Sequence, residues 1–332
     1  MPTLSSRHLS ATVWTRKAVV FLILWYLWSG CTLFLNKYVV FFMKGDPVVL
    51  ACSQMWMTLI LGFLQMHFPL GMFEAQERKT SPPNFYLNML IVGALRFATV
   101  LLGLIALNYV EVSFTETVKS SAPAFTVLIS RVMTGEVTGL FVNLSLLPVM
   151  GGLALCSANE LSFHILGFLA AIGTNVSECL QNVFSKVLIS GDAYKYSPAE
   201  IQFYTSLTSL LVQLPVMVFM TDFDKTWDSF TSQYFVACLF NGIFFHFQTI
   251  SAYVLMDFIS PVTHSVANTA KRALLIWLSV ILFGNPVTLL SGLGTVIVIL
   301  GVLAYNKAKE IDHKKKWHIP AVSFNIKEAR LS

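Results

Sequence analysis

A succession of long apolar stretches constrains the fold of this chain more than any other feature. Short polar turns separate the stretches, which cover residues 18–41, 48–70, 86–109, 112–133, 139–157, 163–189, 200–220, 232–256, 260–283 and 287–306. A helix needs about 20 apolar residues to cross the hydrocarbon core of a bilayer. Charged residues make up 12% of the chain, whereas soluble domains carry roughly 25%. The sequence therefore predicts an all-α polytopic membrane protein with ten transmembrane helices.

The positive charges indicate how such a protein is oriented. With ten spans both termini lie on one side, and that side holds most of the basic residues outside the spans: Arg7, Arg16, Lys17, Arg78, Lys79, Arg131, Lys186, Lys195, Lys307, Lys309 and Lys314 to Lys316. The other side holds only Lys37, Lys44 and Lys225. Lys and Arg accumulate in cytosolic loops. The N-terminal arm, 1–17, and the C-terminal tail, 307–332, are thus predicted to be cytosolic.

A weak internal repeat suggests two halves. The sequence Gly151-Gly152-Leu153-Ala154, in the fifth stretch, resembles Gly301-Val302-Leu303-Ala304, in the tenth, 150 residues later. The predicted repeats are residues 18–157 and 162–306, with five helices each. Because five is odd, the second half has the opposite topology to the first. Inverted repeats are typical of secondary transporters, which bind substrate near the bilayer midplane where the repeats meet.

Several classes of function are disfavoured by what the sequence lacks. It contains no HExxH, GxSxG or Walker motif, so neither an enzyme nor a nucleotide-driven pump is expected. The five cysteines show no CxxC spacing, and neither a metal nor a cofactor is expected. The net charge of +5 has no basic stripe with interleaved aromatics, so no nucleic-acid partner is expected. The lipid bilayer is the expected partner of the helices. The sequence specifies no oligomeric state.

Three cations at membrane depth are the strongest functional signal. Lys119 lies within the fourth stretch, and Lys271 and Arg272 lie near the centre of the ninth. A charge at the bilayer centre costs about 2.5–3.5 kcal/mol on insertion scales, so it usually faces a cavity or a partner. An Arg fork and a Lys point charge suit phosphate oxygens. The alternative is an internal ion pair, since Glu116 precedes Lys119 at helical spacing.

Polar residues extend these sites along their helices. His264, Asn268 and Arg272 recur every four residues and share one helix face, as do Thr115 and Lys119. These side chains either line a binding cavity or form interhelical hydrogen bonds.

Other polar residues at membrane depth are weaker candidates. They either line the cavity or pack between helices, and they are Arg96, Glu178, Asn182, His246 and Gln248. Lys37 lies near the end of the first stretch, where its side chain is expected to reach the membrane interface.

Two segments resemble a known transporter family. Residues 112–119, VSFTETVK, are similar to the VSFTxTxK motif of the plastid triose-phosphate/phosphate translocators and their endomembrane relatives. Residues 259–272, ISPVTHSVANTAKR, resemble that family's SP-[LV]-T-H-[SA]-V-G-N-x-x-KR segment, and Leu35-Asn36-Lys37 matches its first-span LNK. The resemblance covers roughly 18–309. The chain is similar to solute carrier family 35, subfamily E, within the drug/metabolite transporter superfamily.

The resemblance implies two inverted five-helix repeats and exchange of phosphorylated metabolites or nucleotide sugars by alternating access. It also places Lys119, Lys271 and Arg272 at the positions that hold phosphate in plastid members. The sequence departs from those members at three positions: Glu116 replaces His, Ala267 replaces Gly, and Gln248 replaces Tyr. These departures preserve the expected anion site but argue against triose-phosphate specificity.

The resulting hypothesis is that the protein is a secondary active transporter, specifically an antiporter, which exchanges a phosphate-bearing organic anion for a counter-anion. The candidate substrate-binding residues are Lys119, Lys271, Arg272, Thr115, Glu116, His264, Asn268 and Gln248. The expected address is a Golgi or other endomembrane, since residues 1–17 show no plastid transit peptide. The alternatives are an exporter of an uncharged or cationic metabolite, and a non-transporting membrane scaffold.

Overall fold

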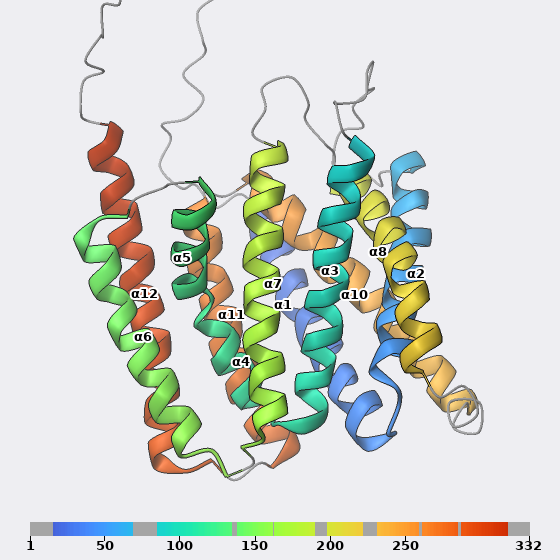
Figure 1. Ribbon diagram of the computed structural model, residues 1–332, viewed down its shortest axis with the longest axis horizontal. Coiled ribbons are helices and arrows are strands. Elements are labelled where there is room, and N and C mark those ends of the chain that lie inside the picture. Colours follow the sequence, from blue (N-terminus) through green and yellow to red (C-terminus); the bar gives the residue numbers. More distant parts are fainter. Residues whose placement is uncertain are drawn as a thin grey trace, which may run out of the picture.

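Helices make up all the regular structure that the computed structural model describes. It describes residues 16–68, 85–134, 138–161, 163–189, 198–221, 231–258, 261–284 and 287–317. The helices, shown in Figure 1, are α1 (Arg16–Lys37), the π-helix η1 (Tyr38–Phe42), α2 (Pro47–His67), α3 (Phe85–Tyr109), α4 (Val112–Ser120), α5 (Ala122–Thr134), α6 (Leu140–Ala158), α7 (Ile165–Ile189), α8 (Pro198–Met220), α10 (Ser232–Phe258), α11 (Pro261–Phe283) and α12 (Leu289–Trp317).

Each predicted apolar stretch corresponds to one helical segment, which confirms the all-α polytopic fold. In the described residues, seven helices are long and apolar enough to cross a membrane by themselves. The other three segments are α4 with α5, α7 and α11, and α4 and α11 carry all the predicted substrate-binding residues except Gln248. The last helix differs most from its prediction, because α12 continues through Trp317 rather than ending at residue 306.

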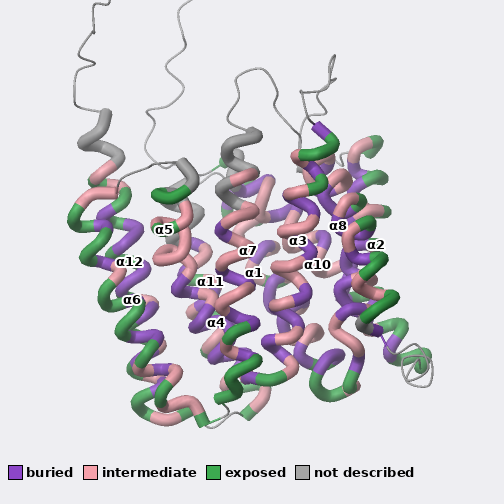
Figure 2. Tube along the Cα trace, in the orientation of Figure 1, coloured by how far each residue is buried: buried purple, intermediate pink, exposed green. Residues whose placement is uncertain are grey.

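The outer surface of the bundle is apolar. Leu140 and Leu147 of α6 and Leu289 and Leu300 of α12 are all more than half exposed. Figure 2 shows exposed positions along the outward sides of the helices and buried ones between them. A soluble monomer rarely exposes so continuous an apolar surface. These side chains therefore face lipid.

Closely packed helix pairs build the bundle. In Figure 1, α6 and α12 lie side by side at one edge, and α2 and α8 at the other. Gly152 and Gly301 allow the close approach of α6 and α12: a Cβ added at Gly152 would lie 2.7 Å from the carbonyl oxygen of Gly294. Small residues play this role in many membrane helix pairs. Gly151, which aligns with Gly301 in the repeat, has open space around it. Of these two aligned glycines, only Gly301 is needed for close helix packing.

The helix contacts are symmetric between the two predicted halves. Helix α3 packs on α7 and α8, just as α10 packs on α1 and α2. Helices α2 and α8, α4 and α11, and α6 and α12 pack on each other. If each helix of residues 18–157 is exchanged for its counterpart in 162–306, these contacts map onto one another. This pattern is the one expected when two repeats are related by a two-fold axis.

Lys37 corrects the expectation that its side chain reaches the membrane interface. The side chain is 2% exposed, and it lies 3.7 Å from the carboxylate of Glu111. Its Nζ donates hydrogen bonds to the carbonyl oxygens of Leu107, at 3.0 Å, and Val110, at 3.1 Å. The last carbonyls of a helix have no partner within the helix. Lys37 therefore satisfies the end of α3 and fixes it to α1.

Candidate functional site

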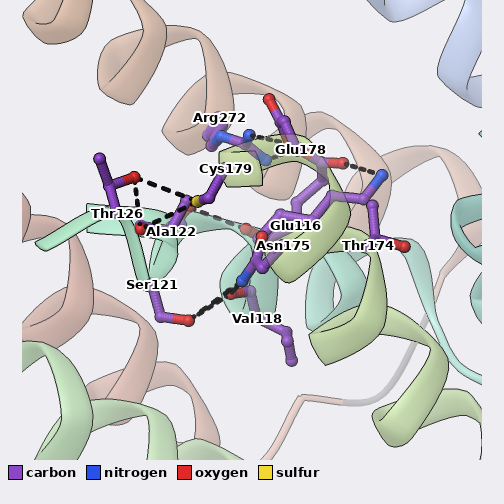
Figure 3. Close-up of polar contacts among 12 residues, drawn as sticks. Glu116, Val118, Ser121, Ala122, Thr126, Thr174, Asn175, Glu178, Cys179 and Arg272 are labelled. Carbon is purple, nitrogen blue, oxygen red and sulfur yellow. Dashed lines mark hydrogen bonds and ion pairs between the residues drawn. The ribbon is translucent and has the colours of Figure 1, made fainter. Parts of the chain in front are cut away.

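The fourth apolar stretch is broken at Ser121, and this break shapes the site. Pro123 has no N–H to donate to the carbonyl oxygen of Lys119, so the hydrogen-bond ladder of α4 is interrupted, and Pro123 lies in the first turn of α5, where a proline is tolerated. Asn175 of α7 donates hydrogen bonds to the carbonyl oxygen of Val118 at 2.8 Å and to Oγ of Ser121 at 3.3 Å (Figure 3). Helix α4 is thus a separate nine-residue helix, held by α7. Discontinuous helices of this kind form binding sites in many transporters.

We predict that Asn175→Ala destabilises the protein. The substitution removes the side-chain hydrogen bonds that join α7 to the end of α4, and a buried hydrogen bond contributes about 0.5–1.5 kcal/mol. The carbonyl oxygen of Val118 keeps the backbone N–H and the hydroxyl group of Ser121 as donors. The apparent melting temperature of the purified protein should fall relative to wild type. Asn143→Ala is the matched control, because the Asn143 side chain is exposed. Equal melting temperatures for the two variants would contradict this role for Asn175.

Glu116 of α4 bridges two of the predicted cations. Its Oε1 lies 3.5 Å from Nζ of Lys119, and its Oε2 lies 3.3 Å from a terminal nitrogen of Arg272 on α11. The other terminal nitrogen of Arg272 lies 3.7 Å from Oε2 of Glu178 on α7. Figure 3 shows the guanidinium group of Arg272 facing the side chains of Glu116 and Glu178. The structure therefore brings α4, α7 and α11 together around one ionic cluster.

Lys271 completes this cluster from the side of α1. Its Nζ lies 4.3 Å from the ring centroid of Trp25, a cation–π contact. Lys271 directly precedes Arg272 in α11, close enough for long-range Coulombic interaction with Glu116, Glu178 and Lys119, although no ion pair within the described residues joins it to them. Three cations and two carboxylates, +3 and −2, give the group a formal charge of +1. We call these five residues, Lys119, Lys271, Arg272, Glu116 and Glu178, the charge cluster.

The remaining predicted site residues have varied surroundings. The hydroxyl group of Thr115 is buried and donates to the carbonyl oxygen of Glu111 at 3.0 Å. Asn268 and Gln248 are half-buried, and neither side chain makes a hydrogen bond within the described residues. The side chain of His264 lies outside the described residues, as does that of Asn182. A role in substrate binding stays a prediction for Asn268, Gln248 and His264, and for the weaker candidate Asn182.

Two of the weaker candidates belong to a second buried polar group between α2, α3, α8 and α10. Arg96 donates a hydrogen bond to Oγ1 of Thr205 at 2.7 Å. Nε2 of His246 lies 3.1 Å from the side-chain oxygen of Gln65, and its Nδ1 lies 3.2 Å from the amide nitrogen of Gln202. No ion pair or hydrogen bond between described residues joins this group to the charge cluster. Arg96 and His246 therefore hold helices together in this conformation.

Sequence reasoning missed the parts played by Asn175 and Trp25. Pro123 within an apolar stretch was a usable signal for the helix break, but Asn175 lies on α7, far away in the sequence, and no local pattern identifies it as the cap. Nothing in the sequence around Trp25 indicates its contact with Lys271, because the two residues lie on helices far apart in the chain. The pairing of Arg272 with Glu116 and Glu178 likewise depends on contacts between helices.

The charge cluster can bind an anion. Two ammonium groups and a guanidinium group approach one buried region from α4 and α11, and their formal charge exceeds that of the carboxylates. An Arg fork and Lys point charges match the oxygens of a phosphate group, and charge-assisted hydrogen bonds are among the strong ones.

The sequence matches known transporters over most of its length. The profile of the Triose-phosphate Transporter family matches residues 16–306. The chain is 32% identical to the glucose-6-phosphate/phosphate translocator 1, chloroplastic, of Arabidopsis thaliana, over 82% of this chain and 72% of the relative. It is 32% identical to the phosphoenolpyruvate/phosphate translocator 2, chloroplastic, of the same plant, over 80% of this chain and 69% of the relative.

Another relative is matched over a smaller part of its length. The phosphoenolpyruvate/phosphate translocator 3, chloroplastic, of Oryza sativa subsp. japonica is 36% identical, over 63% of this chain and 55% of the relative. The chain thus spans about half to three quarters of the length of these curated relatives. One solved crystal structure superposes with a TM-score of 0.58 at 13% identity, covering 90% of this chain and 98% of its own. That similarity supports the fold alone.

Proposed function

Because the chain belongs to the Triose-phosphate Transporter family, we propose that it is a secondary active transporter for a phosphate-bearing organic anion. The anion would bind at the charge cluster, between α4 and α11, and would cross the membrane by alternating access in exchange for a counter-anion. The observation that carries this proposal is the convergence of Lys119, Lys271 and Arg272 from two helices onto one buried region. The transporters named above support a sugar phosphate or another small phosphorylated acid as substrate.

Residues near the charge cluster would contact the part of the substrate other than its phosphate group. We propose that Thr115, His264, Asn268 and Gln248 contribute to this recognition, together with Glu116. The departures from the plastid pattern at Glu116, Ala267 and Gln248 suggest a substrate other than triose phosphate. A nucleotide sugar stays within the proposed class, because it also presents phosphate oxygens to the cations.

We propose the two inverted repeats, 18–157 and 162–306, as the units that move. The exchange symmetry of the helix contacts supports this division, and it places α4 against α11 where the halves meet. The basic residues support a cytosolic location of both the arm, 1–17, and the tail, 307–332. An endomembrane address, with Golgi as the specific prediction, rests on the sequence alone, since the named relatives are plastid proteins.

Uptake of labelled inorganic phosphate into reconstituted liposomes tests the proposal. We expect saturable uptake into vesicles preloaded with phosphate, above that of protein-free vesicles. Unlabelled phosphoenolpyruvate, sugar phosphates and nucleotide sugars should be tested as competitors, with glucose as the uncharged control. At least one phosphate-bearing anion should compete, and glucose should not. Uptake equal to that of protein-free vesicles, or competition by glucose alone, would contradict the proposal.

A further inference from the structure

Glu116 occupies the place where an anion would best contact the cations. One of its carboxylate oxygens contacts Lys119 and the other contacts Arg272, at 3.5 Å and 3.3 Å. A bound phosphate group would make the same bridging contacts with two of its oxygens. Ligand and carboxylate therefore compete for the same pair of cations, if the proposed function is correct.

The position of Glu116 is fixed by its helix. Within α4 every residue except Lys119 is buried, and the end of this helix is capped by Asn175. The Glu116 side chain is 6% exposed, whereas that of Glu178 is 34% exposed and pairs with Arg272. Glu178 thus lies at the more open side of the cluster and bridges no second cation through a described ion pair. Only Glu116 reproduces the contacts of a bridging anion.

An empty site without this carboxylate would be unfavourable to enclose. Lys119, Lys271 and Arg272 repel one another, and a charge left unpaired away from water is costly. Many exchangers depend on this cost, because the carrier then reorients only with a ligand bound. Glu116 reduces the cost when no ligand is present, since it neutralises part of the cationic charge itself.

We propose that Glu116 is a tethered counter-anion that sets the coupling of this transporter. In the empty site it pairs with Lys119 and Arg272, so that the carrier can reorient without a ligand. A phosphate-bearing anion displaces the carboxylate from these two cations when it binds. Exchange is therefore possible but not obligatory, and Glu116 lowers the apparent affinity for the ligand because it is a permanent competitor.

The test compares uptake of labelled inorganic phosphate into empty vesicles and into vesicles preloaded with phosphate. For the wild-type protein, uptake into empty vesicles should be of the same order as uptake into preloaded ones. For Glu116→Gln, the carboxylate charge is lost while size is kept. Preloading should then raise uptake by about tenfold or more, the equivalent of one charge-assisted contact. The variant should also reach half-maximal uptake at a lower phosphate concentration.

Two further variants sharpen the comparison. Glu160→Gln makes the same chemical change outside the charge cluster, where Glu160 contacts Ser291, and should behave like wild type. Glu116→Asp keeps the charge and should restore uptake into empty vesicles at least in part. Wild-type uptake that requires preloading would overturn the inference, as would equal preloading dependence in wild type and Glu116→Gln. If Glu116→Gln does not fold, the wild-type comparison still decides.

The same experiment gives a different result if the proposed transport function itself is wrong. Wild-type vesicles would then take up no phosphate under either condition, and no phosphorylated competitor would bind. A requirement for preloading, by contrast, contradicts only the role of Glu116 and leaves phosphate transport intact.

Discussion

Arg272→Ala should nearly abolish phosphate uptake into preloaded vesicles. The substitution removes the guanidinium group that lies 3.3 Å from Glu116 and 3.7 Å from Glu178. The formal charge of the cluster falls from +1 to 0, and both carboxylates would repel an incoming anion. Truncating one partner of a buried charge pair costs about 2–5 kcal/mol, so we expect uptake to fall by about 30-fold or more.

Arg131→Ala is the matched control for this prediction, because Arg131 lies exposed at the end of α5. It should transport like wild type. Arg272→Lys keeps the charge but loses the planar fork, so its uptake should lie between wild type and Arg272→Ala. Normal uptake by a Lys271→Ala, Arg272→Ala double variant would contradict the proposed site and favour export of an uncharged or cationic metabolite. A folded protein is required for either conclusion, and a single symmetric peak in size-exclusion chromatography checks it.

Lys37→Met should cause the largest loss of stability among the substitutions considered. The Nζ group of Lys37 contacts two carbonyl oxygens at the end of α3 and the carboxylate of Glu111. Methionine fills a similar volume but leaves these three groups without this partner. Breaking a buried ion pair on one side costs about 3–5 kcal/mol. The apparent melting temperature of the purified protein should fall accordingly.

Lys44→Met provides the control, since the side chain of Lys44 is exposed. It should melt within a few degrees of wild type, as expected of surface substitutions worth about 0.5 kcal/mol or less. A Lys37→Met, Glu111→Gln double variant should recover part of the loss, because the carboxylate that loses its contact with Lys37 then no longer carries a charge. Equal melting temperatures for Lys37→Met and Lys44→Met would show that the buried contacts of Lys37 contribute little.

The fold could be predicted from the sequence because lipid imposes a simple rule on helix length. Ten apolar stretches of suitable length correspond to ten helical segments among the described residues. The break at Ser121 was not predicted, although Pro123 gives a local physical reason for it. The burial of Lys37 was also mispredicted. A lysine at the end of a span can reach the interface or cap a neighbouring helix, and only the packing of α3 on α1 decides between the two.

The candidate site was predicted in part. Cations at membrane depth are costly, so Lys119, Lys271 and Arg272 stood out from the sequence. Glu116 was also recognised as a partner for Lys119, because their spacing is local. Its second contact, with Arg272, joins helices that are far apart in the chain and carries no sequence signal. That contact changes the interpretation of the site, from three uncompensated cations to a cluster with a built-in anion.

The most direct measurement is an experimental structure with a phosphate-bearing ligand bound, determined under conditions that saturate uptake. We expect the phosphate group between α4 and α11, within hydrogen-bonding distance of Lys119 and Arg272, with the Glu116 carboxylate displaced from both. Phosphate bound elsewhere, for example beside the buried guanidinium of Arg96, would contradict the assignment of the charge cluster as the substrate site.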